Sequence, residues 1–212
     1  MSQHSIVLLG GGGHCHSVIE SIEKSGEFVI AGILAPLPHT GEKVSGYPVI
    51  GTDDDIPRLA ALGHAFLITV GHIRNSMPRQ KLFELLKSMD TSIATVIDPT
   101  AVVSERAEIG EGTVILRHAF VNAGVKTGNN CIVNTGAMVE HDSIIGNHVH
   151  ISTGAIVNGD CTIGDHCFIG SGAIISNNLN ICANTLVGAG TVVLKSITRP
   201  GIYLGNPAQF IK

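Results

Sequence analysis

The stretch VEHDSIIGNHVHISTGAIVNGDCTIGDHCFIG, residues 139–170, places an aliphatic residue at every sixth position. Stepping by six in both directions extends the series to Ile109, Ile115, Val121, Thr127, Val133, Val139, Ile145, Ile151, Val157, Ile163, Ile169, Ile175, Ile181, Val187 and Val193. Only Thr127 is not aliphatic, and no insertion breaks the spacing. A short, fixed period of this kind is typical of a solenoid, in which each repeat packs on its neighbours.

Two other positions of the hexapeptide support this interpretation. The residue four places after each aliphatic one is mostly small or apolar, which suits a narrow interior. Cys131, Cys161 and Cys167 occupy this position, so we interpret them as core residues. The residue three places after is Gly, Asn, Asp or His in nearly every unit, from Gly112 to Ser196. These residue types best tolerate a positive φ, so a turn is expected in every hexapeptide.

The first 97 residues follow a different pattern, in which strands and helices alternate. Strands are expected at 5–9, 28–34, 65–70 and 92–97, and helices after the glycines at 10–13, at 52–62 and at 76–89. Such alternation predicts a small parallel sheet with helices on its faces. The sequence therefore predicts an α/β unit followed by a solenoid.

Composition argues against several classes of function. The 212 residues carry a net charge of −4 without a basic stripe, and Trp is absent, so binding to nucleic acid or to a membrane is not expected. The apolar run at 6–9 is too short for a signal peptide or a membrane span. None of the five Cys forms a CxxC pair. We expect a cytoplasmic protein with reduced thiols.

Three motifs add a resemblance to a known family: LLGGGGH (8–14), VEHD (139–142) and LGNPA (204–208). With the hexapeptides, they resemble the bacterial sugar acetyltransferases that modify nucleotide-linked 4-amino sugars or sialic acid for surface polysaccharides and glycans. The resemblance spans essentially the whole chain and is strongest to perosamine N-acetyltransferases. It implies a Rossmann-like α/β domain (1–98), a left-handed parallel β-helix (99–198) and a C-terminal segment (199–212). It also implies acetyl-CoA as co-substrate, a homotrimer and no metal.

The resemblance implies that His141 is the catalytic base and that Asp142 is its acidic partner. By spacing, His141 is an outward residue between Ala123 and Gly159 in the neighbouring coils, which leaves open space beside its ring. A carboxylate beside an imidazole can fix its tautomer and raise its basicity. The alternatives are a solvated surface His and an Asp that merely forms a turn.

The resemblance implies that acetyl-CoA lies in grooves between subunits and contacts His150, and we expect it to contact Ser171 and Ala189 as well. His150 is unusual because its neighbours in adjacent coils, Ile132 and Phe168, are apolar. Ser171 and Ala189 continue a column of small side chains along which a pantetheine arm could lie. The alternatives are a packed surface His and small residues on a flat face.

The resemblance implies that the sugar nucleotide binds at Gly12, Gly13, His14 and Gly71. The Gly-rich turn at 10–13 precedes a helix and would allow an anion to approach the backbone closely. Family members that use UDP-sugars carry two acidic residues after the second strand. Ala35 and Pro36 stand there in this chain, which favours another base such as guanine.

The leading hypothesis is therefore acetylation of the 4-amino group of a nucleotide-linked 4-amino-4,6-dideoxy sugar, with GDP-perosamine favoured. O-acetylation of sialic acid, N-acetylation of a UDP-sugar, and a catalytically silent protein that binds both ligands remain alternatives. A metal is not expected, since His148 and His150 have no third ligand in this register. Phe120, Met138 and Phe168 are expected to contribute to the contacts of a trimer.

Overall fold

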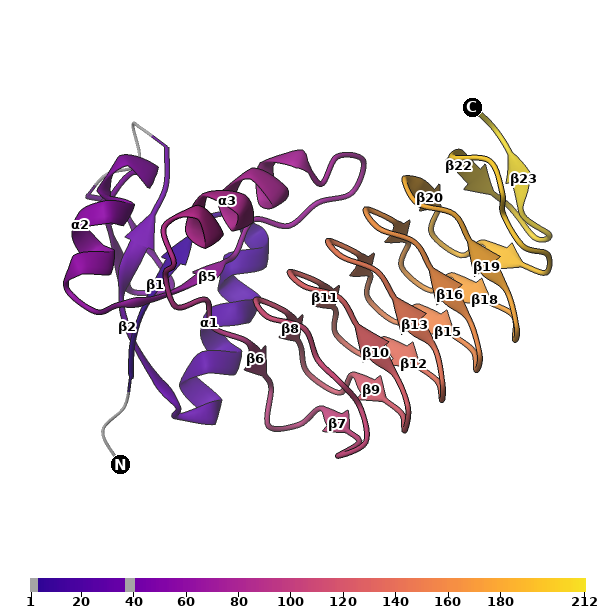
Figure 1. Cartoon of the computed structure of the whole chain (residues 1–212), viewed down its shortest axis with the longest axis horizontal. Coiled ribbons are helices and arrows are strands. Elements are labelled where there is room, and N and C mark those ends of the chain that lie inside the picture. The colour runs from indigo at the N-terminus through magenta and orange to yellow at the C-terminus, as the bar shows by residue number, and fades with distance from the viewer. Residues whose placement is uncertain (1–3, 37–40) are drawn as a thin grey trace.

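The computed structural model describes residues 4–36 and 41–212, and it has two parts packed end to end, an α/β unit and a β-helix (Figure 1). The α/β unit contains β1 (His4–Leu9), α1 (Gly13–Ser25), β2 (Phe28–Leu34), β3 (Lys43–Val44), β4 (Tyr47–Gly51), a 3-10 turn (Asp53–Asp55), α2 (Ile56–Ala61), β5 (Ala65–Ile68) and α3 (Met77–Ser88). Its sheet has the order β3-β4-β2-β1-β5, and all strands but β3 run parallel. The predicted α/β unit is confirmed. Within the described ranges, no helix is long and apolar enough to cross a membrane.

The sheet differs from the prediction at both edges. The β3–β4 hairpin was not predicted; its turn is Ser45–Gly46, and both residues have a positive φ, as two-residue hairpin turns require. The prediction of one strand at 92–97 is wrong. Ile93 makes only an isolated bridge to Phe66, while Val96 and Ile97 pair with the β-helix. The reason is that Ala94 and Val96 are buried against α1, so the segment passes from one sheet to the other.

The β-helix is built from short parallel strands arranged in three sheets, which we call faces 1, 2 and 3. Face 1 contains β6 (Val96–Ile97), β8 (Val114–Ile115), β11 (Ile132–Val133), β14 (His150–Ile151), β17 (Phe168–Ile169), β20 (Thr185–Val187), β22 (Gly201–Leu204) and β23 (Gln209–Phe210). Face 2 contains β7 (Val102–Val103), β9 (Phe120–Val121), β12 (Met138–Val139), β15 (Ile156–Val157), β18 (Ile174–Ile175) and β21 (Val192–Val193). Face 3 contains β10 (Lys126–Thr127), β13 (Ile144–Ile145), β16 (Thr162–Ile163) and β19 (Asn180–Ile181).

Neighbouring coils are offset by 18 residues, as the pairing of Ile132 with His150 and of His150 with Phe168 shows. The predicted turn positions have positive φ throughout, at Gly112, His118, Gly124, Asn130, Gly136, Asp142, His148, Gly154, Asp160, His166, Gly172, Asn178, Asn184 and Gly190. Ser196, which was expected to continue this series, is not among the residues with positive φ. The hexapeptide interpretation of the sequence is therefore confirmed almost residue by residue.

The three inward cysteines are part of the core of the β-helix. Cys131, Cys161 and Cys167 are at most 1% exposed, and each thiol donates to a backbone carbonyl of the next coil. Burial raises the pKa of Cys131 to about 11 and that of Cys167 to about 12. Since the thiolate is the reactive form, these thiols are inert at neutral pH.

The last coil ends differently from the others. β22 extends face 1 in parallel with β20, and the chain then reverses so that β23 pairs antiparallel with β22. Ile202 exchanges backbone hydrogen bonds with Ile211 and Lys212. The terminal strand thus covers the edge of face 1.

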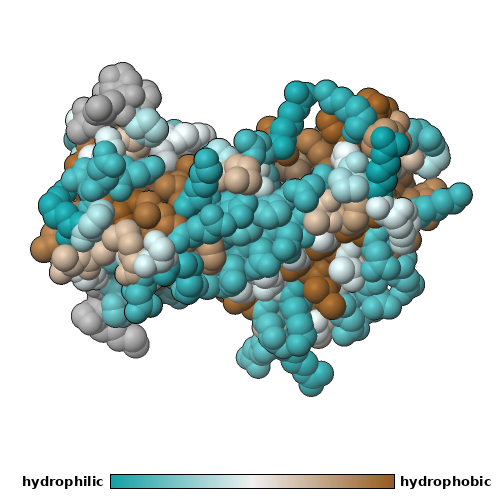
Figure 2. All heavy atoms as spheres, turned by 45° about the horizontal axis from the view of Figure 1, so that its top comes forward, coloured by the Kyte–Doolittle hydropathy of each residue, from teal (hydrophilic) through white to brown (hydrophobic). Residues whose placement is uncertain are grey.

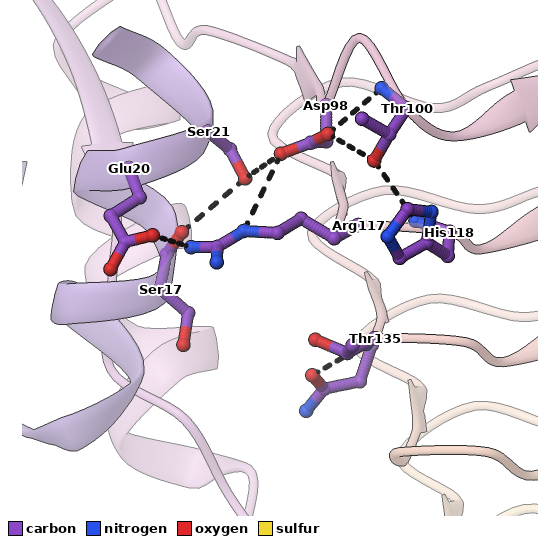
Figure 3. Close-up of polar contacts among 9 residues, drawn as sticks. Ser17, Glu20, Ser21, Asp98, Thr100, Arg117, His118 and Thr135 are labelled. Atoms are coloured by element: carbon purple, nitrogen blue, oxygen red, sulfur yellow. Dashed lines mark hydrogen bonds and ion pairs between the residues drawn. The ribbon is translucent and has the colours of Figure 1, made fainter. Parts of the chain in front are cut away.

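The carboxylate of Asp98, which is 0% exposed, connects the two parts at their junction. Ser21 of α1 donates to it at 2.7 Å, and Thr100 donates through its hydroxyl at 2.7 Å and its backbone N–H at 2.9 Å. Arg117 approaches the same carboxylate at 3.9 Å and also pairs with Glu20 of α1 (Figure 3). Helix α1 is therefore fixed against the first coils by charge as well as by apolar contacts.

A second polar contact crosses the junction from α3. Arg79 is fully buried, and among the described residues it has no carboxylate partner. Its guanidinium donates to the carbonyls of Ile68, Val70, Gly112 and Asn130. Burial lowers its pKa to about 10, so Arg79 is still protonated at neutral pH. The side chain of Asn130 in turn donates to the Arg79 carbonyl and to His148. One cation thus joins β5, the loop after it and two coils.

We predict that Arg79→Met destabilises the protein by about 3 kcal/mol or more, because four carbonyls at the junction lose their donor in a buried setting. The measurement is chemical denaturation at neutral pH. Arg58→Met is the matched control, because Arg58 is exposed and pairs only with Asp55, and it should cost less than about 1 kcal/mol. Equal losses for the two variants would contradict this role for Arg79.

Candidate active site

A cavity of about 760 Å³ lies between the α/β unit and face 1. Its walls are Gly12, Gly13, His14, Thr69, Val70, Gly71, His72, Ile73, Arg74, Asn75 and His150. All four residues predicted to bind the sugar nucleotide are among them, together with one residue predicted to bind acetyl-CoA. The fold therefore brings the Gly-rich turn, the end of β5 and the β-helix to one place.

The N-terminus of α1 opens into this cavity. Gly12 is the N-cap residue and provides no side-chain cap, and the first turn contains no acidic residue. A Cβ on Gly12 or Gly13 would meet nothing within 4 Å, so the space beside this turn is open. At Gly10, by contrast, φ is +110° and a Cβ would lie 2.6 Å from Val70. Glycine is therefore needed at this position for backbone conformation and packing. Free N–H groups and the helix dipole favour an anion at this point.

His150 is held in one tautomer by two hydrogen bonds. Its Nδ1–H donates to the carbonyl of His72 at 2.8 Å, and Asn134 donates its side-chain amide to Nε2 at 3.1 Å. The ring also packs edge-on against Phe168 and His72, with centroid distances of 5.2 and 5.4 Å. His150 therefore connects the β-helix to the loop that follows β5.

The histidines around the cavity are uncharged at neutral pH. Burial, followed by the charge of Arg79, lowers the pKa of His14 to about 3. Burial and His150 lower that of His72 to about 3, and burial lowers that of His150 to about 4. Just outside the cavity, burial and the stacked ring of His166 lower the pKa of His148 to about 4. The cavity is therefore walled by neutral imidazoles near a buried cation.

His141 and Asp142 lie elsewhere, at the corner of the β-helix between faces 2 and 3. Their side chains are 57% and 69% exposed, and Nδ1 of His141 lies 3.0 Å from Oδ2 of Asp142. The imidazole lies directly over Gly159, where a Cβ would come within 2.6 Å of the ring. The predicted pairing is present, the ring lies against Gly159, and Nε2 of His141 makes no hydrogen bond among the described residues.

Ser171 and Ala189 lie at a different corner, between faces 1 and 2. They stack on Thr153, which follows His150 by three residues, through hydrogen bonds from Gly172 N–H to the Thr153 carbonyl and from Gly190 N–H to the Ser171 carbonyl. The Ser171 hydroxyl bonds that of Ser152 at 3.0 Å. The column of small residues thus begins beside the cavity, whereas His141 is at the opposite edge of face 2.

Sequence reasoning missed His72, Arg74, Arg79 and Asn134. His72 follows the last strand of the parallel sheet, and ligands of such sheets bind at the carboxyl ends of the strands, so a signal for it was present. Arg79 and Asn134 act across the junction, and no local pattern marks them. Within residues 4–36 and 41–212, no group of His, Cys, Asp or Glu is arranged to hold a metal ion.

Comparisons with known proteins agree with this geometry. The model of the PglD N-terminal domain matches residues 5–86. The acetyltransferase domain of PglB from Neisseria gonorrhoeae is 31% identical over 99% of this chain and 100% of its own, with a TM-score of 0.92. PerB from Caulobacter crescentus, solved with CoA and GDP-perosamine, is 32% identical over 100% of this chain and 99% of its own, with a TM-score of 0.92. WeeI from Acinetobacter baumannii is 28% identical, with coverage of 99% and 100% and a TM-score of 0.89. A search of curated proteins finds no match.

The fold and the site define an acyltransferase with a left-handed parallel β-helix and acetyl-CoA as co-substrate. The chain belongs to the family of hexapeptide-repeat sugar acetyltransferases that act on nucleotide-linked amino sugars, and it is a sugar N-acetyltransferase.

The lowered pKa of His148 predicts a dependence of stability on pH. The unfolded chain takes up a proton at this residue near pH 6.5 but the folded chain only near 4, so stability falls as the pH decreases through this window. Between pH 7 and 5 the contribution is on the order of 1–2 kcal/mol. We predict that His148→Asn, which keeps a residue suited to positive φ, flattens the curve of unfolding free energy against pH by this amount.

His118→Asn is the control for this measurement, because His118 has the same backbone conformation but is exposed. It should leave the slope of the curve unchanged. The same slope in wild type and His148→Asn would show that His148 titrates normally in the folded protein.

Proposed function

We propose that the enzyme transfers the acetyl group of acetyl-CoA to the 4-amino group of a nucleotide-linked 4-amino-4,6-dideoxy sugar, GDP-perosamine being favoured. The observation that carries the proposal is the open N-terminus of α1 in a cavity free of carboxylates, which suits the diphosphate of a sugar nucleotide. The similarity to PerB, solved with CoA and GDP-perosamine, supports the same pair of ligands. Ala35 and Pro36 line a neighbouring cavity with Gly11, Gly12 and Glu42. Positions 35 and 36 therefore provide no acidic pair for a uracil ring, and the carboxylate that borders this cavity comes from Glu42.

In the proposed reaction, the neutral amine attacks the carbonyl carbon of the thioester. His141 accepts the proton from the amine at Nε2, while Asp142 accepts the Nδ1–H and holds the tautomer that leaves Nε2 free. The C–N bond forms, the C–S bond breaks, and CoA leaves as a thiolate that regains a proton. His150, Ser171 and Ala189 line the path of acetyl-CoA beside the cavity.

A trimer would unite the separate parts of this site. On face 2, the outward residues of successive coils form an apolar ladder, Val102, Phe120, Met138, Ile156, Ile174 and Val192. Figure 2 shows hydrophobic residues at the surface of the β-helical half among mostly hydrophilic ones. Phe168, which was expected to join this contact, is only 8% exposed and packs against His72 and His150 instead.

The two corners that border face 2 carry the two groups of site residues. If three copies pack face 2 around a threefold axis, the corner with Ser171 and Ala189 of one subunit approaches the corner with His141 of the partner subunit. The catalytic pair would then face the cavity of its neighbour. We therefore propose that each active site is shared between two subunits of a homotrimer.

The proposed substrate is tested by incubating the protein with acetyl-CoA and GDP-, UDP- or dTDP-linked 4-amino sugars and measuring CoA release. We expect the fastest turnover with the GDP-sugar. Faster turnover with a UDP-sugar, or O-acetylation of sialic acid alone, would replace the proposed substrate. Binding of both ligands without turnover would identify a catalytically silent protein.

The role of His141 is tested by His141→Asn. We predict that kcat falls by about a hundredfold or more with little change in KM for acetyl-CoA, since a general base contributes about 10²–10⁴ in rate. The acidic limb of the profile of kcat/KM against pH should also disappear. His118→Asn makes the same change at an exposed site and should retain full activity. A loss of only about tenfold would assign His141 to orienting the amine by a hydrogen bond.

The trimer is tested by placing a charge on the ladder. We predict that Met138→Glu dissociates the trimer and abolishes turnover, because a carboxylate would be buried in an apolar contact. Ile144→Glu is the matched control, since Ile144 is exposed on face 3. Sedimentation velocity measures the oligomeric state. A wild-type monomer at micromolar concentration would contradict the shared site.

A further inference from the structure

The loop between β5 and α3 is tied to the β-helix at both of its ends. At one end, the His72 carbonyl accepts the Nδ1–H of His150 at 2.8 Å. At the other, the hydroxyl of Ser76 lies 2.9 Å from Nδ1 of His166. We call residues 72–76 the tethered loop. Its middle residues have no regular structure, but the two imidazole contacts fix where they lie.

Arg74, in the middle of the tethered loop, is a cation without a counter-ion. Its side chain is exposed and lines the 760 Å³ cavity. Within the part of the chain that the structure describes, it makes no ion pair and no hydrogen bond. No carboxylate lines the cavity, so the Arg74 guanidinium does not stabilise the fold through an ion pair there.

The N-terminus of α1 lines the same cavity. The 13-residue helix opens with Gly13, and neither it nor Gly12 has a Cβ that would cover the backbone N–H groups. His72 also lines the cavity, but its ring packs edge-on against His150 and Phe168, and both ring nitrogens are buried. The cavity therefore holds two sources of positive potential, the guanidinium of Arg74 and the N-terminus of α1.

We propose that Arg74 binds the diphosphate of the sugar nucleotide and holds it against the N-terminus of α1. This rests on the proposed function and assigns a phosphate-binding residue to it. A guanidinium suits this task because its planar donors can engage two phosphate oxygens at once. The tethers through His150 and His166 would hold Arg74 ready, so that less conformational entropy is lost on binding.

CoA also carries a diphosphate, so the test compares the two ligands on the full-length protein. Isothermal titration calorimetry measures the Kd of GDP, guanosine and CoA for wild type, Arg74→Gln, Arg74→Lys and Lys81→Gln. Lys81, an exposed residue of α3 outside the cavity, is the control for the loss of one positive charge. Circular dichroism verifies that the variants are folded.

We expect Arg74→Gln to weaken GDP binding about tenfold or more, as for a lost hydrogen bond to a charged group. The Kd values of guanosine and CoA should change less than about twofold. Arg74→Lys should recover part of the affinity for GDP. Raising the salt concentration should weaken GDP binding less in Arg74→Gln than in wild type. Lys81→Gln should match wild type. Loss of CoA affinity instead of GDP affinity, or equal loss of guanosine, would overturn the assignment.

Turnover of the nucleotide sugar separates this proposal from the function on which it rests. If wild type acetylates a nucleotide-linked amino sugar and Arg74→Gln binds GDP as well as wild type does, only the role of Arg74 fails. If wild type neither binds a nucleoside diphosphate nor acetylates such a sugar, the proposed function and the role of Arg74 fail together.

Discussion

One residue in every six must adopt the left-handed backbone conformation, and the architecture of the β-helix depends on this constraint. Gly, Asn, Asp and His meet it in turn after turn, with φ between 55° and 75° from Gly112 to Gly190. Each such residue lets the chain turn from one face to the next and keeps coils in an 18-residue register. The register stacks side chains of like position, which is why an imidazole at 141 can lie over a glycine at 159.

The α/β unit is placed relative to this solenoid by a few buried polar groups. Asp98 holds α1, and Arg79 holds the end of β5 through carbonyl acceptors on both sides of the junction. The first residues of α1 and the residues that follow β5 both line the cavity. Because buried polar groups are costly when unpaired, these contacts fix the angle between the parts more strictly than apolar packing would. The geometry of the proposed nucleotide site thus depends on Asp98 and Arg79, which do not line the cavity.

The sequence predicted the β-helix well because its signal is local and repeated. A turn residue, an inward aliphatic residue and a small residue recur at fixed spacing. A single exception such as Thr127 therefore does not obscure the repeat. The same register predicted the open space beside His141 and the apolar neighbours of His150. The α/β unit was predicted at the level of its long elements, whereas the Ser45–Gly46 hairpin and the transfer of Val96 to face 1 depend on tertiary contacts. The tethered loop and Arg79 were missed for the same reason.

The ends of the β-helix bear on its behaviour in solution. A stack of parallel strands presents unsatisfied N–H and C=O groups at both extremities, and such edges can recruit further chains into fibres. Here the first coil is covered by the α/β unit, and the reversed strand β23 covers the last strand of face 1. The C-terminal segment therefore pairs with the last parallel strand of face 1, and β23 becomes the outermost strand of that sheet among the described residues. In the proposed trimer, subunits would associate sideways through the apolar ladder of face 2, and the threefold axis would close them into a discrete assembly.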